Sequence, residues 1–192
     1  MKKILSLIIF IVTIFLTTTL GIAGDYSNIS KNSEITAALN ALESIGKTDV
    51  IAILNGNNST GQPIRILFRD MTIYGAKDCE AVTTRTQDGK KLIIYINAEH
   101  KGAPTEAIAC LIAHESQHHT MTNTRAEETR AWLKEVSTWN AFVRRDRSVA
   151  LVKHPLVKRE NYIAKLNARD NGAGNEIRKI VAQNPVYARL EN

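Results

Sequence analysis

The sequence predicts an α+β fold in one domain, in which a small, mostly antiparallel sheet packs on a helix and the C-terminal half is mostly helical. Three observations predict it. A segment with helical periodicity comes first, β-branched runs joined by short turns follow, and helical patterns dominate from Pro104 onward. The length of 192 residues fits one domain, and the sequence contains no internal repeat and no inter-domain linker.

The first helix is expected to begin at Ser33, a possible cap, and to stop at Gly46. Its apolar residues recur at helical spacing, at Ile35, Leu39, Leu42 and Ile45. The following stretch TDVIAILNGN is too short and too apolar for its periodicity to decide between helix and strand.

A strand is predicted at PIRILF, and a hairpin is predicted from AVTTRT and KLIIYIN across the turn residues Asp88 and Gly89. Pro104 suits the first position of the next helix, PTEAIACLIAHESQHH. The later segments EETRAWLKEVSTWNAFVRR, LVKRENYIAKLNAR and NEIRKIVAQN are amphipathic, so the remainder is expected to be helical.

Residues 1–24 predict a secretory signal peptide. Two lysines precede a run of 17 uncharged residues, and small residues then suit cleavage after Ala23 or Gly24. The alternative is an uncleaved membrane anchor, because such a run lies at the short end of the spanning range. We expect a mature domain over residues 25–192 that is secreted, periplasmic or held in the cell envelope, and that meets a membrane only through this segment if it is uncleaved.

The charge balance argues against a nucleic-acid-binding protein. The formal net charge is +6, and it falls to +4 without the two N-terminal lysines, because 23 basic residues then face 19 acidic ones. This balance is only mildly basic, and no stripe of aromatic and basic residues is present. No nucleic-acid partner is therefore predicted.

Two cysteines, Cys79 and Cys110, lie in the mature part of the chain. In an oxidising compartment such a pair predicts one disulfide. The alternative is a pair of buried thiols.

The stretch AHESQHH contains the candidate metal-binding and catalytic residues of this sequence. His114 and His118 are four residues apart on a predicted helix, so both imidazoles can reach one zinc ion. Glu115 points away from their line by about 100 degrees, which leaves it free to act as the general base of an H-E-x-x-H site. An apolar helix leads into the motif, and the strand KLIIYIN before it could form the wall along which an extended substrate pairs.

A third zinc ligand is expected from the next acidic residues, Glu127 and Glu128. Glu127 stands in T-x-x-E spacing with Thr124, a capping box, and shares a solvated helix face with Arg130, Lys134 and Thr138. Glu128 shares the apolar face with Ala131, Trp132, Glu135 and Trp139. A carboxylate on a core-facing stripe needs a partner, so Glu128 is the predicted ligand.

HESQH, followed ten residues after its second histidine by E-T-R-A, resembles the gluzincin branch of the zincin metallopeptidases. The wider stretch, about residues 91 to 140, also resembles a group of uncharacterised secreted bacterial zincin-like proteins. The resemblance implies a zincin-like fold, in which a short sheet packs on the active-site helix and a second helix carries the glutamate. It implies His114, His118 and Glu128 as ligands and Glu115 as base. Trp132 departs from one branch, which has Asp there, so the acid that orients a ligand is absent or supplied elsewhere.

The predicted function is that of a secreted zinc-dependent peptidase acting on a peptide or protein substrate. The alternative is a zincin-like module that binds zinc and turns over poorly or not at all. An oxyanion donor is needed beside the metal, and the candidates are Tyr162, Tyr187 and His154. His100 and His119 are expected at the surface, and Trp132 and Trp139 in the core.

Overall fold

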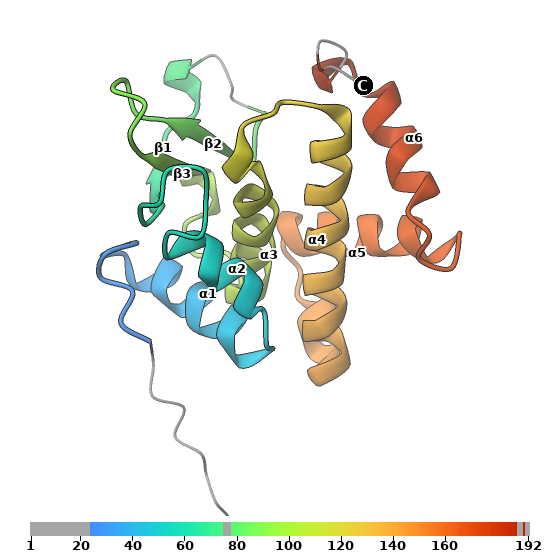
Figure 1. Cartoon of the computed structure of the whole chain (residues 1–192). Coiled ribbons are helices and arrows are strands. Elements are labelled where there is room, and N and C mark those ends of the chain that lie inside the picture. The colour runs from blue at the N-terminus through green and yellow to red at the C-terminus, as the bar shows by residue number, and fades with distance from the viewer. Residues whose placement is uncertain (1–23, 75–77, 188–189, 191–192) are drawn as a thin grey trace, which may run out of the picture.

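Helices dominate the computed structural model, which describes residues 24–74, 78–187 and 190 (Figure 1). Within these ranges the helices are α1 (Ser33–Ser44), α2 (Thr48–Leu54), α3 (Thr105–Glu115), α4 (Arg125–Arg145), α5 (Pro155–Ala168) and α6 (Asn175–Gln183). The strands are β1 (Arg65–Arg69), β2 (Ala81–Arg85) and β3 (Leu92–Asn97). The α+β class and the helical C-terminal half are confirmed.

The sheet is mixed, not mostly antiparallel as predicted. Its strand order is β1-β3-β2, with β2 and β3 antiparallel and β1 and β3 parallel. The hairpin is confirmed, and its turn closes with a hydrogen bond from the Thr86 N–H to the Lys91 carbonyl and with Gly89 at φ +69°. The prediction failed because periodicity identifies strands but carries no information on which strand lies between the other two.

The first two helices cover one end of the core. Asn32, not Ser33, caps α1, accepting hydrogen bonds from the N–H groups of Glu34 and Ile35. The helix stops before Gly46, as predicted, and this glycine has φ +74°. The undecided segment after it is a helix, α2, because Val50 and Leu54 then bury on one face.

Helix α3 lies at the centre of the molecule, where it contacts β2, β3, α1, α4 and α5 (Figure 1). All of its residues from Ala107 to Glu115 are buried. This burial explains why the helix is apolar on every side and not amphipathic. Pro104 is its N-cap residue, so the helix begins at Thr105, one residue later than predicted.

The predicted disulfide is wrong. Cys79 and Cys110 are both free thiols. Cys110 is fully buried in the hydrophobic core on α3, whereas Cys79 is half-buried in the segment before β2. The alternative of separate thiols therefore holds, although only Cys110 is fully buried.

The C-terminal half wraps around α4, which packs on α3, α5 and α6. A small second cluster of apolar side chains joins α4, α5 and α6; its members are Val136, Ile163, Leu166, Ile177 and Val181. The predicted signal segment lies outside the described residues. None of the helices described is both long enough and apolar enough to span a membrane.

Candidate metal centre

The two motif histidines lie where α3 gives way to a 3₁₀ helix, η3 (Ser116–Thr120). His114 is in the last turn of α3 and His118 is in η3, and their ring centroids are 5.4 Å apart. The chain then reverses through Met121 and Asn123, which both have positive φ, and α4 begins. This reversal places the first turn of α4 against the histidines.

Three predicted ligands converge at this reversal. One ligand atom from each of His114, His118 and Glu128 lies within 4.8 Å of the other two. The carboxylate oxygens of Glu128 are 3.8 Å from Nε2 of His114 and 3.5 Å from Nε2 of His118. Ligand atoms on a tetrahedral zinc ion stand about 3.4 Å apart, so the spacing fits such an ion.

The donor set also fits a cation on chemical grounds. Oε2 of Glu128 is buried and has no hydrogen-bond partner among the described residues. Burial raises the pKa of Glu128, more than the two nearby imidazoles lower it. A buried carboxylate oxygen without a hydrogen-bond partner and two imidazole nitrogens are donor atoms that a zinc ion can bind together.

Each histidine is oriented by a buried carboxylate at its other ring nitrogen. Nδ1 of His114 is 2.9 Å from Oε2 of Glu135, and Nδ1 of His118 is 3.1 Å from Oε1 of Glu127. An ionised carboxylate only accepts, so each Nδ1 carries the proton and each Nε2 presents a lone pair to the shared point. The acid missing at position 132 is thus supplied by these two glutamates.

Glu127 corrects the sequence analysis, which placed it on a solvated face. Its side chain is fully buried, because the loop before α4 folds over the first turn of that helix. It accepts hydrogen bonds from the Thr122 hydroxyl and from the Asn123 N–H at 3.0 Å. Burial alone would raise its pKa, but the bonds from Thr122 and His118 outweigh this and lower it. Of the two hydrogen bonds of the predicted capping box, the one from the Glu127 N–H to the Thr124 hydroxyl oxygen is present.

Glu135 belongs to a buried charge network that reaches α5. Arg159 donates to Glu135 and, at 3.0 Å, to Glu160. Burial would raise the pKa of Glu135, but the charge of Arg159 and the hydrogen bond from His114 hold it well below its usual range. Burial, with the nearby charge of Glu135, raises the pKa of Glu160 well above its usual range. Glu135 is therefore ionised at neutral pH. Burial lowers the pKa of His114, yet its bond to Glu135 leaves it raised.

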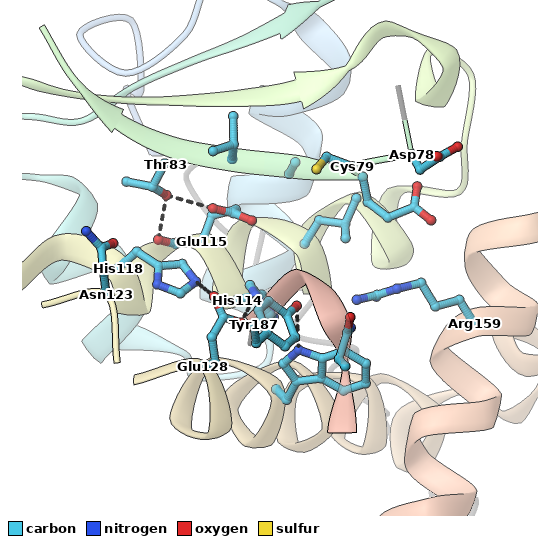
Figure 2. A pocket seen from close by; sticks show the side chains of 16 residues that line it. Asp78, Cys79, Thr83, His114, Glu115, His118, Asn123, Glu128, Arg159 and Tyr187 are labelled. Atoms are coloured by element: carbon cyan, nitrogen blue, oxygen red, sulfur yellow. Dashed lines mark hydrogen bonds and ion pairs between the residues drawn. The ribbon is translucent and has the colours of Figure 1, made fainter. Parts of the chain in front are cut away.

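Glu115 stands beside the ligands and is not one of them. Figure 2 shows it below Thr83, whose hydroxyl is 2.8 Å from Oε2 and 2.8 Å from the main-chain oxygen of Glu115. Thr83 is buried on β2, so the strand fixes the position of the carboxylate. This geometry agrees with the predicted separation of base and ligands.

The residues around the ligands enclose a cavity of about 400 Å³. Tyr187 lines it, whereas Tyr162 is exposed on α5 and His154 caps that helix by accepting from the Leu156 N–H. Of the three candidate oxyanion donors, only Tyr187 is in place. Burial, with the negative charge of Glu128, raises the pKa of Tyr187, so its hydroxyl stays protonated. Cys79 and Arg159 also line this cavity (Figure 2).

Other expectations are corrected at this site. Trp132 lines the cavity in a T-shaped contact with His114, while Trp139 is buried in the core as predicted. His100 is buried and paired with Glu80, because η2 (Ala98–His100) folds back under the segment before β2. His119 is half-buried and is not among the residues that line the cavity, and its Nδ1 has no hydrogen-bond partner among the described residues.

The strand expected to wall the cleft is also different. KLIIYIN forms β3, which is paired on both sides and has no free edge. β2 has an edge unpaired by any described strand, and its residues Ala81, Val82 and Thr83 line the cavity. The Asn97 N–H donates to the Glu80 carbonyl, and the Thr86 N–H donates to the Lys91 carbonyl, so the even-numbered residues along β2 direct their backbone groups towards β3. Because the direction alternates along a strand, the odd-numbered residues direct their N–H and C=O groups to the free edge.

Three residues of the site, Thr83, Glu135 and Arg159, were not predicted from the sequence. The role of Glu135 could have been predicted, because Glu135 lies on the same apolar helix face as Glu128. A buried carboxylate there needs a hydrogen-bond or charge partner, as Glu128 does. No sequence signal connects Thr83 or Arg159 to the motif.

Comparisons of this chain with models of known protein families, with curated proteins and with solved structures found no match.

Proposed function

We propose that this protein is a zinc-dependent peptidase, with His114, His118 and Glu128 as ligands and Glu115 as general base. The observation that carries the proposal is the convergence of the three ligand atoms within 4.8 Å of one another in a cavity that Glu115 also lines. The resemblance of the motif to gluzincins supports zinc as the metal and a zincin-like fold. The predicted signal segment supports a secreted or envelope location.

Zinc bound at this point would polarise a substrate carbonyl and lower the pKa of water towards 7. Glu115 takes the proton from the attacking water and passes it to the leaving amine. The hydrogen bond from Thr83 holds one carboxylate oxygen, which leaves the other to face the cavity. Tyr187 lines the same cavity and is the donor that we assign to the oxygen on which negative charge develops.

An extended peptide is the substrate shape that the cleft favours. The free edge of β2 offers N–H and C=O groups of Ala81, Thr83 and Arg85 to a pairing strand. Thr83 contacts the general base, so a peptide paired there brings its backbone to the reacting groups. The proposal is therefore hydrolysis of a peptide or protein in an extended conformation.

The test compares the zinc-loaded wild type with a Glu115→Gln variant on a peptide library. We expect the wild type to hydrolyse peptides, and the variant to keep one equivalent of zinc and lose at least about a hundredfold in rate. Retained zinc with equal hydrolysis by both proteins would contradict the role of Glu115. Retained zinc with no hydrolysis by either would replace the peptidase by a zinc-binding module.

A further inference from the structure

A second hollow, of about 380 Å³, lies at the far end of β2 from Cys79. It is lined by Arg85, Lys90 and Lys91 together with Ser59, Thr60 and Gln62. Arg85 is the last residue of β2, the strand whose Ala81, Val82 and Thr83 line the metal cleft. One edge strand therefore walls both hollows.

Arg85 has a defined place relative to the general base. Side chains alternate along a strand, so Arg85 and Thr83 point to the same face, about 6.7 Å apart along it. Thr83 contacts Glu115. A peptide extended along β2 thus presents opposite Arg85 a residue two positions from the one opposite Thr83, and cross-strand neighbours place their side chains on the same face.

The guanidinium of Arg85 is held in place but is not neutralised. It donates to the Gly89 carbonyl at 3.2 Å and to the Ser59 hydroxyl at 2.9 Å, which leaves other N–H groups of the fork free. Within the part of the chain described, no carboxylate lies at ion-pair distance from Arg85, Lys90 or Lys91.

One acidic residue, Asp88, belongs to the hairpin loop 86–91, and it is tied into the turn by bonds from Thr86 and the Lys90 N–H. Three cations against this single anion leave the hollow positive. The other end of the cleft carries the carboxylates of Asp78 and Glu80, of which Glu80 is paired with His100. The cations without a carboxylate partner therefore lie at the Arg85 end of the edge strand.

We propose that the enzyme selects peptides with an acidic side chain on one side of the cleaved bond, about two residues from it, and that Arg85 binds this carboxylate with help from Lys90 and Lys91. The inference rests on the proposed peptidase function and adds its substrate class, acidic peptides. Arg85 is suited to the task because its planar fork can bind a carboxylate through two parallel hydrogen bonds.

The test measures kcat/KM on matched peptides that carry Glu or Gln at each position around the cleaved bond. We expect Glu to be preferred about three- to tenfold at one position on one side only, with the preference falling as ionic strength rises. Arg85→Gln should abolish the preference, so that kcat/KM on the Glu peptide falls to the value on the Gln peptide, while the protein keeps one equivalent of zinc. Arg85→Lys should retain part of it, and Lys153→Gln, an exposed control at a different hollow, should retain all of it.

Two results of this cleavage assay would overturn the inference. Cleavage with no preference for Glu would refute the acidic specificity and leave the peptidase proposal intact. An Arg85→Gln variant that loses equally on Glu and Gln peptides would show that Arg85 only supports the hairpin.

If the wild type cleaves no peptide, the peptidase proposal fails. The preference for acidic peptides is then tested by measuring the binding of fluorescent Glu and Gln peptides to the zinc-loaded Glu115→Gln variant. Tighter binding of the acidic peptide, lost on adding Arg85→Gln, supports it. Equal binding of acidic and neutral peptides overturns it.

Discussion

Replacing Glu135 with Gln removes one negative charge from the buried network behind His114 while nearly preserving its shape. In the native protein Oε2 of Glu135 accepts from Nδ1 of His114 at 2.9 Å and from Nη2 of Arg159 at 3.2 Å, and Oε1 accepts from Nη1 of Arg159. An amide has only one oxygen. If that oxygen faces His114, the NH₂ group faces a donor on Arg159, so the substitution breaks one interaction whichever way it turns.

The magnitude follows from the lost charge. The carboxylate is fully buried and therefore poorly screened, and it makes the imidazole of His114 a better ligand. Losing such a partner weakens metal affinity about 10- to 100-fold, which is about 1.4 to 2.8 kcal/mol. We expect the zinc Kd of Glu135→Gln to rise by this factor, measured by competition with a chromophoric chelator at neutral pH.

Glu160→Gln is the matched control. Glu160 is equally buried and also contacts Arg159, but burial raises its pKa well above its usual range, and no hydrogen bond or ion pair among the described residues joins it to His114 or His118. Its amide variant should bind zinc within about twofold of the wild type. Thermal unfolding of the zinc-free variants reports folding independently. The reasoning is refuted if Glu135→Gln keeps wild-type affinity, or if both substitutions weaken zinc equally.

Three further predictions concern other residues of the site. Thr83→Val should lower kcat about three- to tenfold with zinc content unchanged, because it removes the hydrogen bond that positions Glu115; an unchanged kcat would show that the bond is not used. Tyr187→Phe should lower kcat about a hundredfold in zinc-loaded protein, and a loss confined to KM would exclude oxyanion stabilisation. The hydrogen bond from His100 lowers the pKa of Glu80 below 4.5, so it contributes stability above pH 4.5 that is lost as the pH falls through the lowered pKa. Urea unfolding of zinc-free wild type and Glu80→Gln should therefore differ at neutral pH and converge in acid, and a constant difference would contradict the linkage.

The elements with strong local signals were predictable from the sequence. Gly46 ends α1 as expected, because a residue in the left-handed region after a helix is cheapest as glycine. Gly89, which has φ +69°, places the hairpin turn after Asp88 for the same reason. The motif spacing predicted that His114 and His118 lie side by side. Glu128 was expected as the third ligand from its place on the apolar face of α4, and its carboxylate does lie beside both Nε2 atoms, although Glu127 is the more deeply buried of the two.

What the sequence left open depends on contacts between distant segments. The parallel pairing of β1 with β3 and the edge position of β2 have no local signal, so the strand that walls the cleft was assigned incorrectly. Glu127 was placed in solvent because helical periodicity does not include the loop that folds over the first turn of α4. Cys79 and Cys110 could not be separated without knowing that one lines the cleft and the other faces the core.

The central claim is that His114, His118 and Glu128 bind one metal ion, and metal analysis of purified variants tests it most directly. The account predicts one equivalent of zinc in the wild type, none in His114→Ala or Glu128→Ala, and one equivalent with weaker affinity in Glu127→Gln, because Glu127 only orients His118. Wild-type zinc content and affinity in Glu128→Ala would contradict it.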